Sequence, residues 1–444
     1  MDFNTKMEPL PADEQLKTGS PKQRGYYIYV TEACNLRCNY CFVKNKVNQR
    51  HLTEEVAQRI LAFIKGEGSD LKKVYVHFFG GEPLIRPAMV DYLATELRSW
   101  AGEKGVELRL GITTNGTLLS TANCEMLKRH GVGVQLSLDG GKQGNDVHRQ
   151  LMGGTQSGLA PAGAFDLVQI QNYIAYFGRQ RPNCRMTVTV HNLSYLSESI
   201  RELHALGFKS FSVIPEADCG VWTPEHLSRY EAEMDRVFGY WAAHRDITVN
   251  SIQQTIDKLA QMKERRYLCP VGQTIVGFTV DGDIYPCHDF AGRFAGDPVE
   301  SARLILGNAG SGYLPERRSL WPLVRLDGVK SGNGYDCGTC WARWSCGRGC
   351  PYMNFAHSGD IRTVSATYCA TSRVNASLAL RWMSALGELR PSDSKRSLSA
   401  ERGAGGPALD GKNFEAKAPR RPLSGRPPET TRPASGNCVL GDPV

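Results

Sequence analysis

Short apolar runs alternate with stretches of helical periodicity along the first half of the chain. Between residues 26 and 214, runs rich in β-branched and aromatic residues are followed by segments whose apolar positions recur three and four residues apart. Such repeated strand–helix units form a parallel sheet with helices outside. The predicted strands are 26–31, 74–79, 108–113, 132–138, 185–190 and 210–214, and the predicted helices are 53–65, 87–101, 121–129, 165–177 and 193–206, with Thr53 and Ser120 as N-caps. We therefore expect an α/β fold, a partial TIM-like (β/α)6 barrel over residues 25–222, whose ligands gather at the carboxyl ends of the strands.

The pattern changes on both sides of this segment. Residues 1–24 are polar and lack a sustained period, which predicts a disordered arm. Residues 223–266 predict a helical linker and residues 376–390 a terminal helix, whereas residues 391–444 are rich in Pro, Gly, Ser and Arg and predict a disordered tail. The long glycine-rich stretch 140–163 is interpreted either as a lid or substrate-contacting element at the barrel mouth or as a tolerated insertion.

Composition narrows the class of protein. The chain has 444 residues, of which 41% are hydrophobic, and no apolar run approaches the length of a membrane span. The N-terminus lacks the apolar core of a signal peptide, so we expect a cytoplasmic protein that does not bind membranes. The net charge of +8 is modest and lies partly in the tail, so nucleic acid is not an expected partner. A basic groove that binds an acidic peptide is an alternative that this charge allows. The 14 cysteines are grouped in ligand spacings, which favours metal centres over disulfides.

Three cysteines follow the first predicted strand directly. Cys34, Cys38 and Cys41 have the spacing C-x3-C-x2-C. Three thiolates on one loop can hold three irons of a 4Fe-4S cluster and leave the fourth iron open to a substrate. A zinc site is the alternative, and it would need a fourth ligand, for which His51 is the only near residue.

This triplet, with Tyr40 and Phe42 beside its last cysteine, resembles the signature of the radical S-adenosylmethionine (SAM) enzymes. The resemblance covers about residues 25–375. It implies that the amino and carboxylate groups of SAM chelate the open iron. It also implies that the reduced cluster cleaves SAM to methionine and a 5'-deoxyadenosyl radical, which abstracts a hydrogen atom from the substrate.

The loops after the second, third and fourth strands carry the polar residues that the barrel geometry predicts. In the related enzymes these strand ends contact SAM, and the resemblance extends that role to this chain. A turn stabilised by its own side chain is the alternative for each position. The expected SAM-binding residues are Gly80, Gly81, Glu82, Pro83, Thr114, Asn115, Ser137, Asp139 and Arg149.

A second cysteine-rich segment, residues 267–375, begins with a hairpin that turns at Asp281-Gly282. Its seven ligand-type cysteines are too many for one tetrahedral zinc, although a pair of zinc sites is an alternative. The spacing resembles the SPASM domain of radical SAM enzymes that modify peptides and proteins, and this implies two auxiliary 4Fe-4S clusters. The first would be held by Cys269, Cys287 and Cys350, and the second by Cys337, Cys340, Cys346 and Cys369. Because Ile275 stands about where some relatives have an eighth cysteine, the first cluster should have an open iron or a non-cysteine ligand.

Two further groups are candidates for catalysis. Glu216, Asp218 and Cys219 follow the sixth strand, and Glu216 and Asp218 could hold substrate there. Cys219 could donate a hydrogen atom or an electron to a product radical, and inert packing is the alternative for this lone cysteine. Sulfatase maturases carry an aspartate base immediately after the cysteine of the Tyr-Pro-Cys segment. Here His288 holds that place and Asp289 follows.

The sequence therefore predicts a radical SAM/SPASM enzyme that oxidises a ribosomal peptide or protein, for example by forming a thioether or carbon–carbon crosslink. The expected partners are the substrate, a reductase such as flavodoxin or ferredoxin, and a separate leader-peptide-binding protein. Formylglycine formation of the anaerobic sulfatase-maturase type is the first alternative. The others are a small-molecule radical enzyme, a non-catalytic iron–sulfur electron carrier and a metal-binding scaffold.

Overall fold

A computed structural model describes residues 23–68, 71–152, 162–178, 182–216, 220–262, 268–319, 321 and 326–387. The arm predicted over residues 1–24 lies outside these ranges except for its last two residues, and the predicted tail lies outside them entirely. None of the described helices is both long and apolar enough to cross a bilayer.

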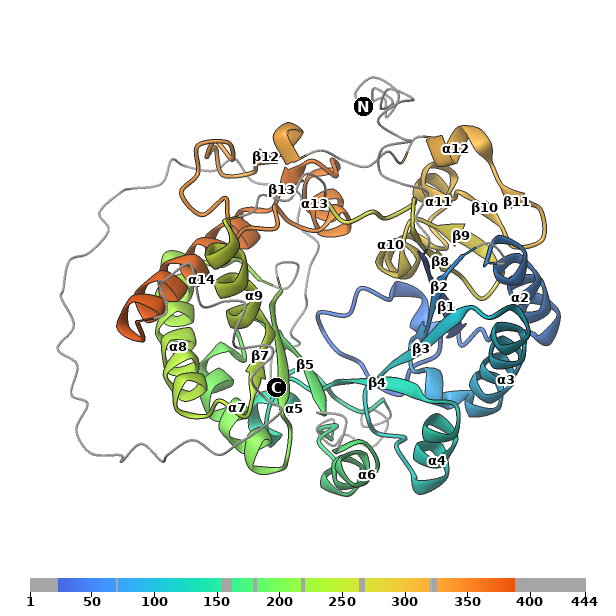
Figure 1. The fold of residues 1–444 in the computed structure, drawn as a ribbon, viewed down its shortest axis with the longest axis horizontal. Coiled ribbons are helices and arrows are strands. Elements are labelled where there is room, and N and C mark those ends of the chain that lie inside the picture. Colours follow the sequence, from blue (N-terminus) through green and yellow to red (C-terminus); the bar gives the residue numbers. More distant parts are fainter. Residues whose placement is uncertain are drawn as a thin grey trace, which may run out of the picture.

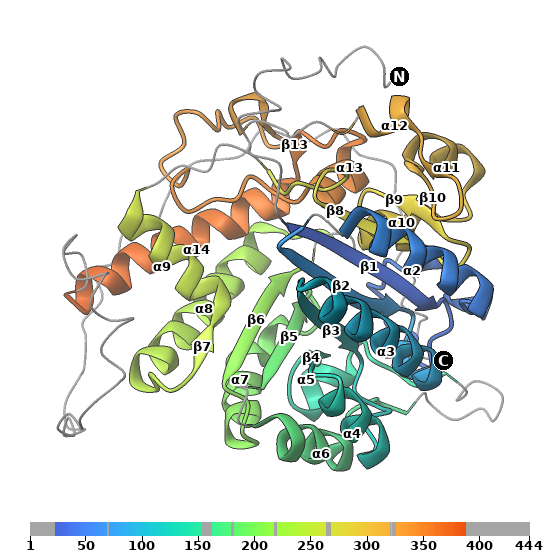
Figure 2. The same cartoon turned by 45° about the vertical axis from the view of Figure 1, so that its right-hand side comes forward.

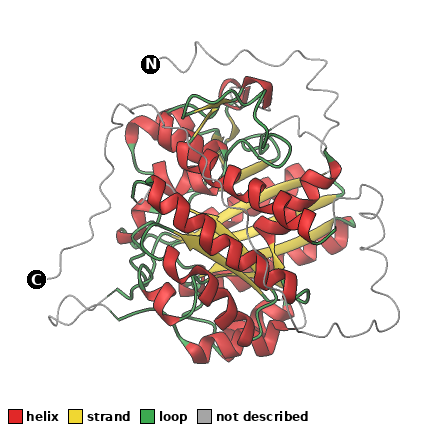
Figure 3. Cartoon of the chain, turned by 90° about the vertical axis from the view of Figure 1, so that its left-hand side faces the viewer, coloured by secondary structure: helices red, strands yellow, loops and turns green. Residues whose placement is uncertain are grey.

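The predicted strands and helices form a curved parallel sheet with helices on its outer side (Figures 1 and 3). The strands follow one another in chain order as β1 (Gln23–Thr31), β2 (Lys73–Gly80), β3 (Glu107–Thr114), β4 (Val132–Ser137), β5 (Asn183–Val188) and β6 (Ser210–Pro215). The helices between them are α2 (Glu54–Gly68), α3 (Pro87–Lys104), α4 (Thr121–Arg129), α6 (Leu167–Phe177) and α7 (Leu196–Ala205). The α/β partial barrel is confirmed.

Alternation along the strands separates the two faces of this sheet. Tyr26 donates a hydrogen bond to Glu67 on α2 at 2.9 Å, so its side of β1 faces the helices. On the helix side, Phe78 and Ile112 are completely buried. Tyr27 and its neighbours two residues apart therefore line the inner face, the lumen of the barrel. This assignment matters because the lumen is where a substrate must lie.

Caps fix where several helices begin. The Ser120 side chain accepts a hydrogen bond from the Asn123 backbone N–H, as predicted for the N-cap of α4. Thr223 forms a capping box with His226 at the start of α8 (Pro224–Ala243). Thr53 accepts from the Val56 N–H at 3.3 Å just before α2.

Three local features differ from the expected pattern. A two-residue strand, β7 (Thr248–Val249), pairs with β6, and it is too short to produce a periodic signal. The helix expected from residue 193 starts as a 3-10 turn, η6 (Leu193–Tyr195). The stretch 140–163 contains a short helix, α5 (Lys142–Asp146), and its residues 153–161 lie outside the described ranges.

The cysteine-rich segment continues the barrel sheet. β8 (Ile275–Phe278) runs parallel to β1, and it turns at Gly282 into the antiparallel β9 (Asp283–Tyr285), as the hairpin pattern predicted. Two short strands, β10 (Gly307–Asn308) and β11 (Gly312–Tyr313), extend the same sheet. In Figure 2, β8 lies beside β1 on the side away from β2.

The remaining elements complete the described part of the chain. They are η2 (Lys44–Val47), η3 (Pro83–Ile85), α9 (Asn250–Gln261), α10 (His288–Phe294), α11 (Pro298–Leu304), α12 (Pro315–Ser319), η7 (Leu326–Gly328), β12 (Lys330–Ser331), α13 (Pro351–Ser358), β13 (Thr363–Val364) and α14 (Ala366–Ala385). Figure 1 shows α13, β12 and β13 between the β8 side and the α9 and α14 side of the molecule. The terminal helix was expected over residues 376–390, but in the structure it is part of α14 and begins earlier, at Ala366.

Candidate iron–sulfur and SAM site

The three-cysteine loop leaves the carboxyl end of β1. Its thiols are free and partly buried, and a backbone turn from the Cys41 N–H to the Cys38 carbonyl (3.1 Å) shapes it. The Cys34 sulfur accepts from the Leu36 N–H at 3.4 Å and from the Asn115 amide at 3.9 Å. Burial raises the pKa of Cys34 to about 12 and that of Cys38 to about 11. Such thiols become thiolates only when a positive centre compensates for the lost hydration, so they suit a metal cluster.

The spacing of the ligand atoms argues against a single-ion site in this loop. Among the described residues, the only three ligand-type side chains whose donor atoms lie within 4.8 Å of one another belong to Cys287, His288 and Asp289. Sulfurs around one tetrahedral zinc are about 4 Å apart, because each zinc–sulfur bond is about 2.3 Å long. The three thiols of the loop therefore fit a polynuclear cluster better than a zinc ion.

The Gly80-Gly81 pair docks against the start of the cysteine loop. The Gly81 N–H donates to the Thr31 carbonyl and the Glu82 N–H to the Ala33 carbonyl, both at 2.9 Å. Gly80 has a φ of +140°, which favours glycine. A Cβ on Gly81 would lie 2.2 Å from the Ala33 carbonyl oxygen, so only glycine allows this approach.

Glu82 joins the second and third strand ends behind this loop. Its buried carboxylate accepts from the Leu84 N–H (3.0 Å), the Thr114 hydroxyl (2.8 Å) and the Asn115 N–H (2.7 Å). Burial raises the pKa of Glu82 to about 7, although these hydrogen bonds favour the ionised form. The Asn115 side chain continues the network to Asn35 at 2.8 Å. The residues expected to bind SAM from these two loops are thus brought together around the cysteines.

Asp139 and Arg149 form a buried pair beside the same loop. Arg149 donates to both oxygens of Asp139, at 2.9 and 3.0 Å, and Asp139 also accepts from Tyr40 and from the Thr187 N–H. Ser137 ends β4 two residues earlier. Because each charge of the pair already has its partner, the pair ties the cysteine loop to β4 and β5. Direct contact of these two residues with SAM stays a prediction.

His288 connects the cysteine-rich segment to the barrel lumen. Its ring stacks on Tyr27 with centroids 4.1 Å apart and meets Phe79 edge to face at 4.6 Å. Its Nε2 lies 3.3 Å from the Asp289 carboxylate, and its buried Nδ1 has no hydrogen-bond partner. Burial lowers the pKa of His288, so the imidazole is neutral. It therefore presents an unused nitrogen beside the lumen.

The C-terminal cysteines fall into two spatial groups. Cys337, Cys340, Cys346 and Cys369 all line one small cavity. Burial raises the pKa of Cys350, with further contributions from Asp289 and Cys269, and burial likewise raises that of Cys287, with contributions from Asp289 and Cys350. This grouping is the one expected for two auxiliary centres, and the clusters themselves are a proposal.

The predicted catalytic residues after β6, Glu216, Asp218 and Cys219, are only partly described. The Glu216 N–H donates to the Val188 carbonyl at 2.8 Å, which places Glu216 at the end of β5 and β6. Asp218 and Cys219 lie outside the described residues. Sequence reasoning missed three polar residues of the lumen, His77, Gln135 and Arg185. For His77 and Arg185, the buried residues on both sides along the strand were a usable signal.

Fold and site together define a parallel half-barrel with a three-cysteine loop at the carboxyl ends of its strands, the arrangement of an iron–sulfur enzyme. Residues 28–158 match the model of the Radical SAM superfamily. The chain therefore carries a radical SAM domain, which implies a 4Fe-4S cluster and SAM.

The chain is also similar to several proteins over part or most of its length. The chain is 26% identical over 363 residues to an uncharacterized protein of Archaeoglobus fulgidus, covering 78% of each chain. It is 28% identical over 166 residues to the serine-type anaerobic sulfatase-maturating enzyme of Klebsiella aerogenes, covering 36% of this chain and 38% of that enzyme. It also spans 60% of the length of an uncharacterized protein of Methanocaldococcus jannaschii. Among solved structures, native anSMEcpe with bound AdoMet shares the fold, with a TM-score of 0.64 and 17% identity over 82% of this chain and all of that one.

Proposed function

We propose that this protein is a radical SAM maturase that oxidises a peptide or protein substrate held in the barrel lumen. The observation that carries the proposal is the stack of His288 on Tyr27. It brings Cys287 and the start of α10 against the face of the barrel where a substrate would lie. A sulfatase-maturase homologue and a structure of the same fold solved with a bound peptide support this substrate class.

Cys34, Cys38 and Cys41 would hold the cluster that binds SAM. When bound, a reduced cluster with SAM supplies a carbon-centred radical that removes one hydrogen atom from the substrate. Glu82, Thr114 and Asn115 keep the cysteine loop in place through their hydrogen bonds. Glu82 and Thr114 are buried, so their hydrogen bonds are shielded from water.

His288 is the proposed general base. After hydrogen abstraction, oxidation by two electrons still requires the substrate to lose one proton and one electron. The unpartnered Nδ1 of a neutral, buried imidazole can accept that proton, and Asp289 can stabilise the resulting imidazolium. The cysteines of the C-terminal groups would hold the electron acceptor. His288 or Asp289 could instead be the non-cysteine ligand of the first auxiliary centre, because the donor atoms of both lie within 4.8 Å of the Cys287 sulfur.

Two reactions fit this arrangement. A thioether or carbon–carbon crosslink is our first proposal, because the residue after Cys287 is histidine and not aspartate. Formylglycine formation is the second, favoured by the sulfatase-maturase relative and by the position of Asp289, next to His288. The variants His288→Gln and Asp289→Asn, each assayed on short cysteine- or serine-containing peptides and on peptides that can be crosslinked, separate the two. Loss of formylglycine formation in Asp289→Asn alone would favour the second reaction.

The first experiment is anaerobic reconstitution with iron and sulfide, followed by iron counting and incubation with dithionite and SAM. About twelve irons per chain, with release of 5'-deoxyadenosine, are expected for three clusters. The triple variant Cys34→Ala/Cys38→Ala/Cys41→Ala should lose about four irons and all SAM cleavage. Bound zinc without SAM cleavage would contradict the proposal and favour a metal-binding scaffold, and iron without cleavage would favour an electron carrier. Flavodoxin or ferredoxin and a leader-peptide-binding protein are the proposed partners to add next.

A further inference from the structure

The inner face of the barrel carries a row of polar groups that the cysteine and SAM site does not use. His77 Nε2 lies 2.8 Å from the Thr113 hydroxyl, and this hydroxyl donates to the side-chain oxygen Oε1 of Gln135 at 3.1 Å. The three side chains come from the adjacent strands β2, β3 and β4. Bulky branched residues usually fill the inner positions of a closed parallel barrel, so a polar row in an open one is suited to a ligand.

Arg185 adds a positive charge to this face. It lies on β5 between the buried residues Cys184 and Met186, so it projects to the opposite, inner side. Within the part of the chain that the structure describes, its guanidinium has no hydrogen bond and no carboxylate within 4 Å. An arginine presents five donors in a planar fork that matches a carboxylate, and partly buried arginines are normally paired.

The charge of Arg185 affects the pKa of residues on other strands of the lumen. Burial lowers the pKa of His77 to about 3, and the positive charge of Arg185 acts in the same direction. Burial raises the pKa of Tyr27 to about 12, and the charge of Arg185 opposes that rise. The Tyr27 ring lies 5.1 Å from that of His77 and 4.1 Å from that of His288, and Arg185 lies on the same inner face of the sheet. The nearby carboxylate of Asp289 lies beside His288.

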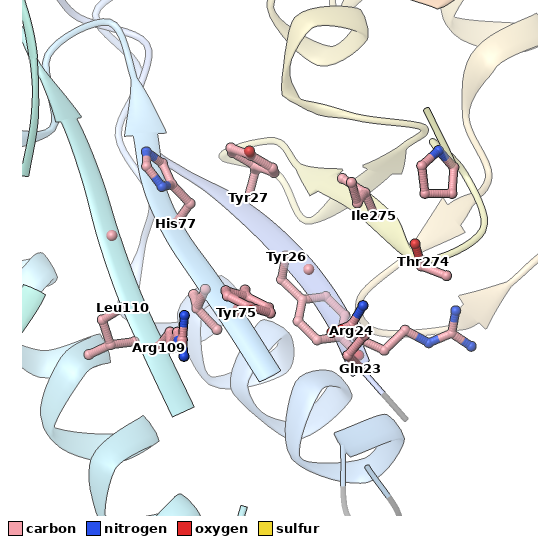
Figure 4. Close-up of a pocket in the computed structure, with 14 residues that line it drawn as sticks. Gln23, Arg24, Tyr26, Tyr27, Tyr75, His77, Arg109, Leu110, Thr274 and Ile275 are labelled. Carbon is pink, nitrogen blue, oxygen red and sulfur yellow. The ribbon is translucent and has the colours of Figure 1, made fainter. Parts of the chain in front are cut away.

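A cavity of about 360 Å³ opens on the same face (Figure 4). Tyr27 and His77 lie toward one end of it and Arg24 and Arg109 toward the other. Gly111 keeps it open, because a Cβ there would lie 2.6 Å from the His77 ring. No acidic residue lines it among the described residues, although Arg109 pairs with Glu107 at the rim. Its volume is within the range of ligand pockets.

We propose that Arg185, flanked by Gln135 and His77, forms a carboxylate-binding subsite in the lumen, and that the substrate is a peptide with an acidic group close to the modified residue. The inference rests on the proposed function and narrows its substrate class. The carboxylate can come from an Asp or Glu side chain or from the peptide's C-terminus. The carboxylate of SAM is the competing source, because Arg185 is in register with Ser137 on β4.

The test uses the reconstituted holoenzyme with SAM and two sets of fluorescein-labelled octapeptide pools. Each pool has a central cysteine or serine and, at one other position, Glu in the first set and Gln in the second, and each is made with a free or an amidated C-terminus. We expect at least one Glu or free-carboxylate pool to bind about tenfold or more tightly than its neutral partner, since charge-assisted hydrogen bonds are about twice as strong as neutral ones. Arg185→Gln should remove the difference and Arg185→Lys should retain part of it. Arg59→Gln, on the exposed outer face of α2, should behave as wild type.

Each outcome decides the matter. Equal binding of charged and neutral pools in every comparison, including no binding at all, would overturn the subsite. Unchanged preference in Arg185→Gln would also overturn it. A weakened Kd for SAM in Arg185→Gln, measured without peptide, would assign Arg185 to the SAM carboxylate instead. Oxidation of each pool is measured separately by mass spectrometry, so oxidation without a charge preference would refute the subsite alone, whereas no oxidation of any pool would count against the proposed function.

Discussion

Arg149 holds Asp139 through two hydrogen bonds, at 2.9 and 3.0 Å, and both side chains are withdrawn from water. The pair joins the end of β4 to the segment after α5, and Tyr40 attaches the cysteine loop to it. This buried ion pair therefore fixes the position of the cysteine loop as well as setting the charge beside it.

Replacing Asp139 with Asn should destabilise the protein strongly. The substitution leaves the buried Arg149 guanidinium without a compensating charge, which costs about 3–5 kcal/mol. Urea unfolding measures the change. Glu55→Gln, which breaks an exposed pair with Arg59 on α2, is the matched control and should cost less than about 0.5 kcal/mol. Equal losses of unfolding free energy in the two variants would show that the buried Asp139–Arg149 pair stabilises the protein no more than an exposed pair does.

Gly81→Ala should disrupt the cysteine loop without altering any cysteine. The new Cβ would lie 2.2 Å from the Ala33 carbonyl oxygen, so the segment leading to Cys34 must move. We expect lower iron incorporation and a loss of SAM cleavage of about tenfold or more, since small displacements of a reacting group are costly. Gly102→Ala on α3 meets no atom within 4 Å and should leave both readouts unchanged. Wild-type SAM cleavage in Gly81→Ala would refute the close docking of the two loops.

Much of this site follows from local sequence patterns, and the remainder depends on contacts between distant segments. The strands of the barrel and the loops around Cys34, Glu82 and Asn115 were predicted because each has its own periodicity or spacing. The parallel pairing of β8 with β1 was not, since Gly25 and Ile275 are far apart in the chain and nothing in either strand specifies its partner. The ion pair of Asp139 with Arg149 also escaped prediction, because the sequence analysis assigned both residues to SAM binding and not to each other.

His77 should make the protein sensitive to mild acid. Its pKa falls from 6.5 to about 3 in the folded state, chiefly through burial. As the pH drops below 6.5, the unfolded chain binds a proton at this position and the folded chain does not, so stability decreases until the pH approaches 3. Between pH 7.5 and 5, wild type should therefore lose about 2 kcal/mol more than His77→Gln. Urea midpoints at the two pH values provide the comparison, and parallel pH profiles of the two proteins would contradict the assignment.

Cys369→Ala should remove one auxiliary centre and leave the SAM site intact. Cys369 lies in the first turn of the long helix α14 and shares a cavity with Cys337, Cys340 and Cys346, so its loss takes one thiolate from that group only. We expect iron to fall from about twelve to about eight per chain, while SAM cleavage without substrate continues. The control is Cys124→Ala, which removes a fully buried thiol that donates to the Leu119 carbonyl. That variant should lose stability, by about 1 kcal/mol or more for the vacated core space, and keep all its iron. If Cys369→Ala kept its iron as well, the four cysteines would not hold a cluster, and the structural argument for a second auxiliary centre would fail.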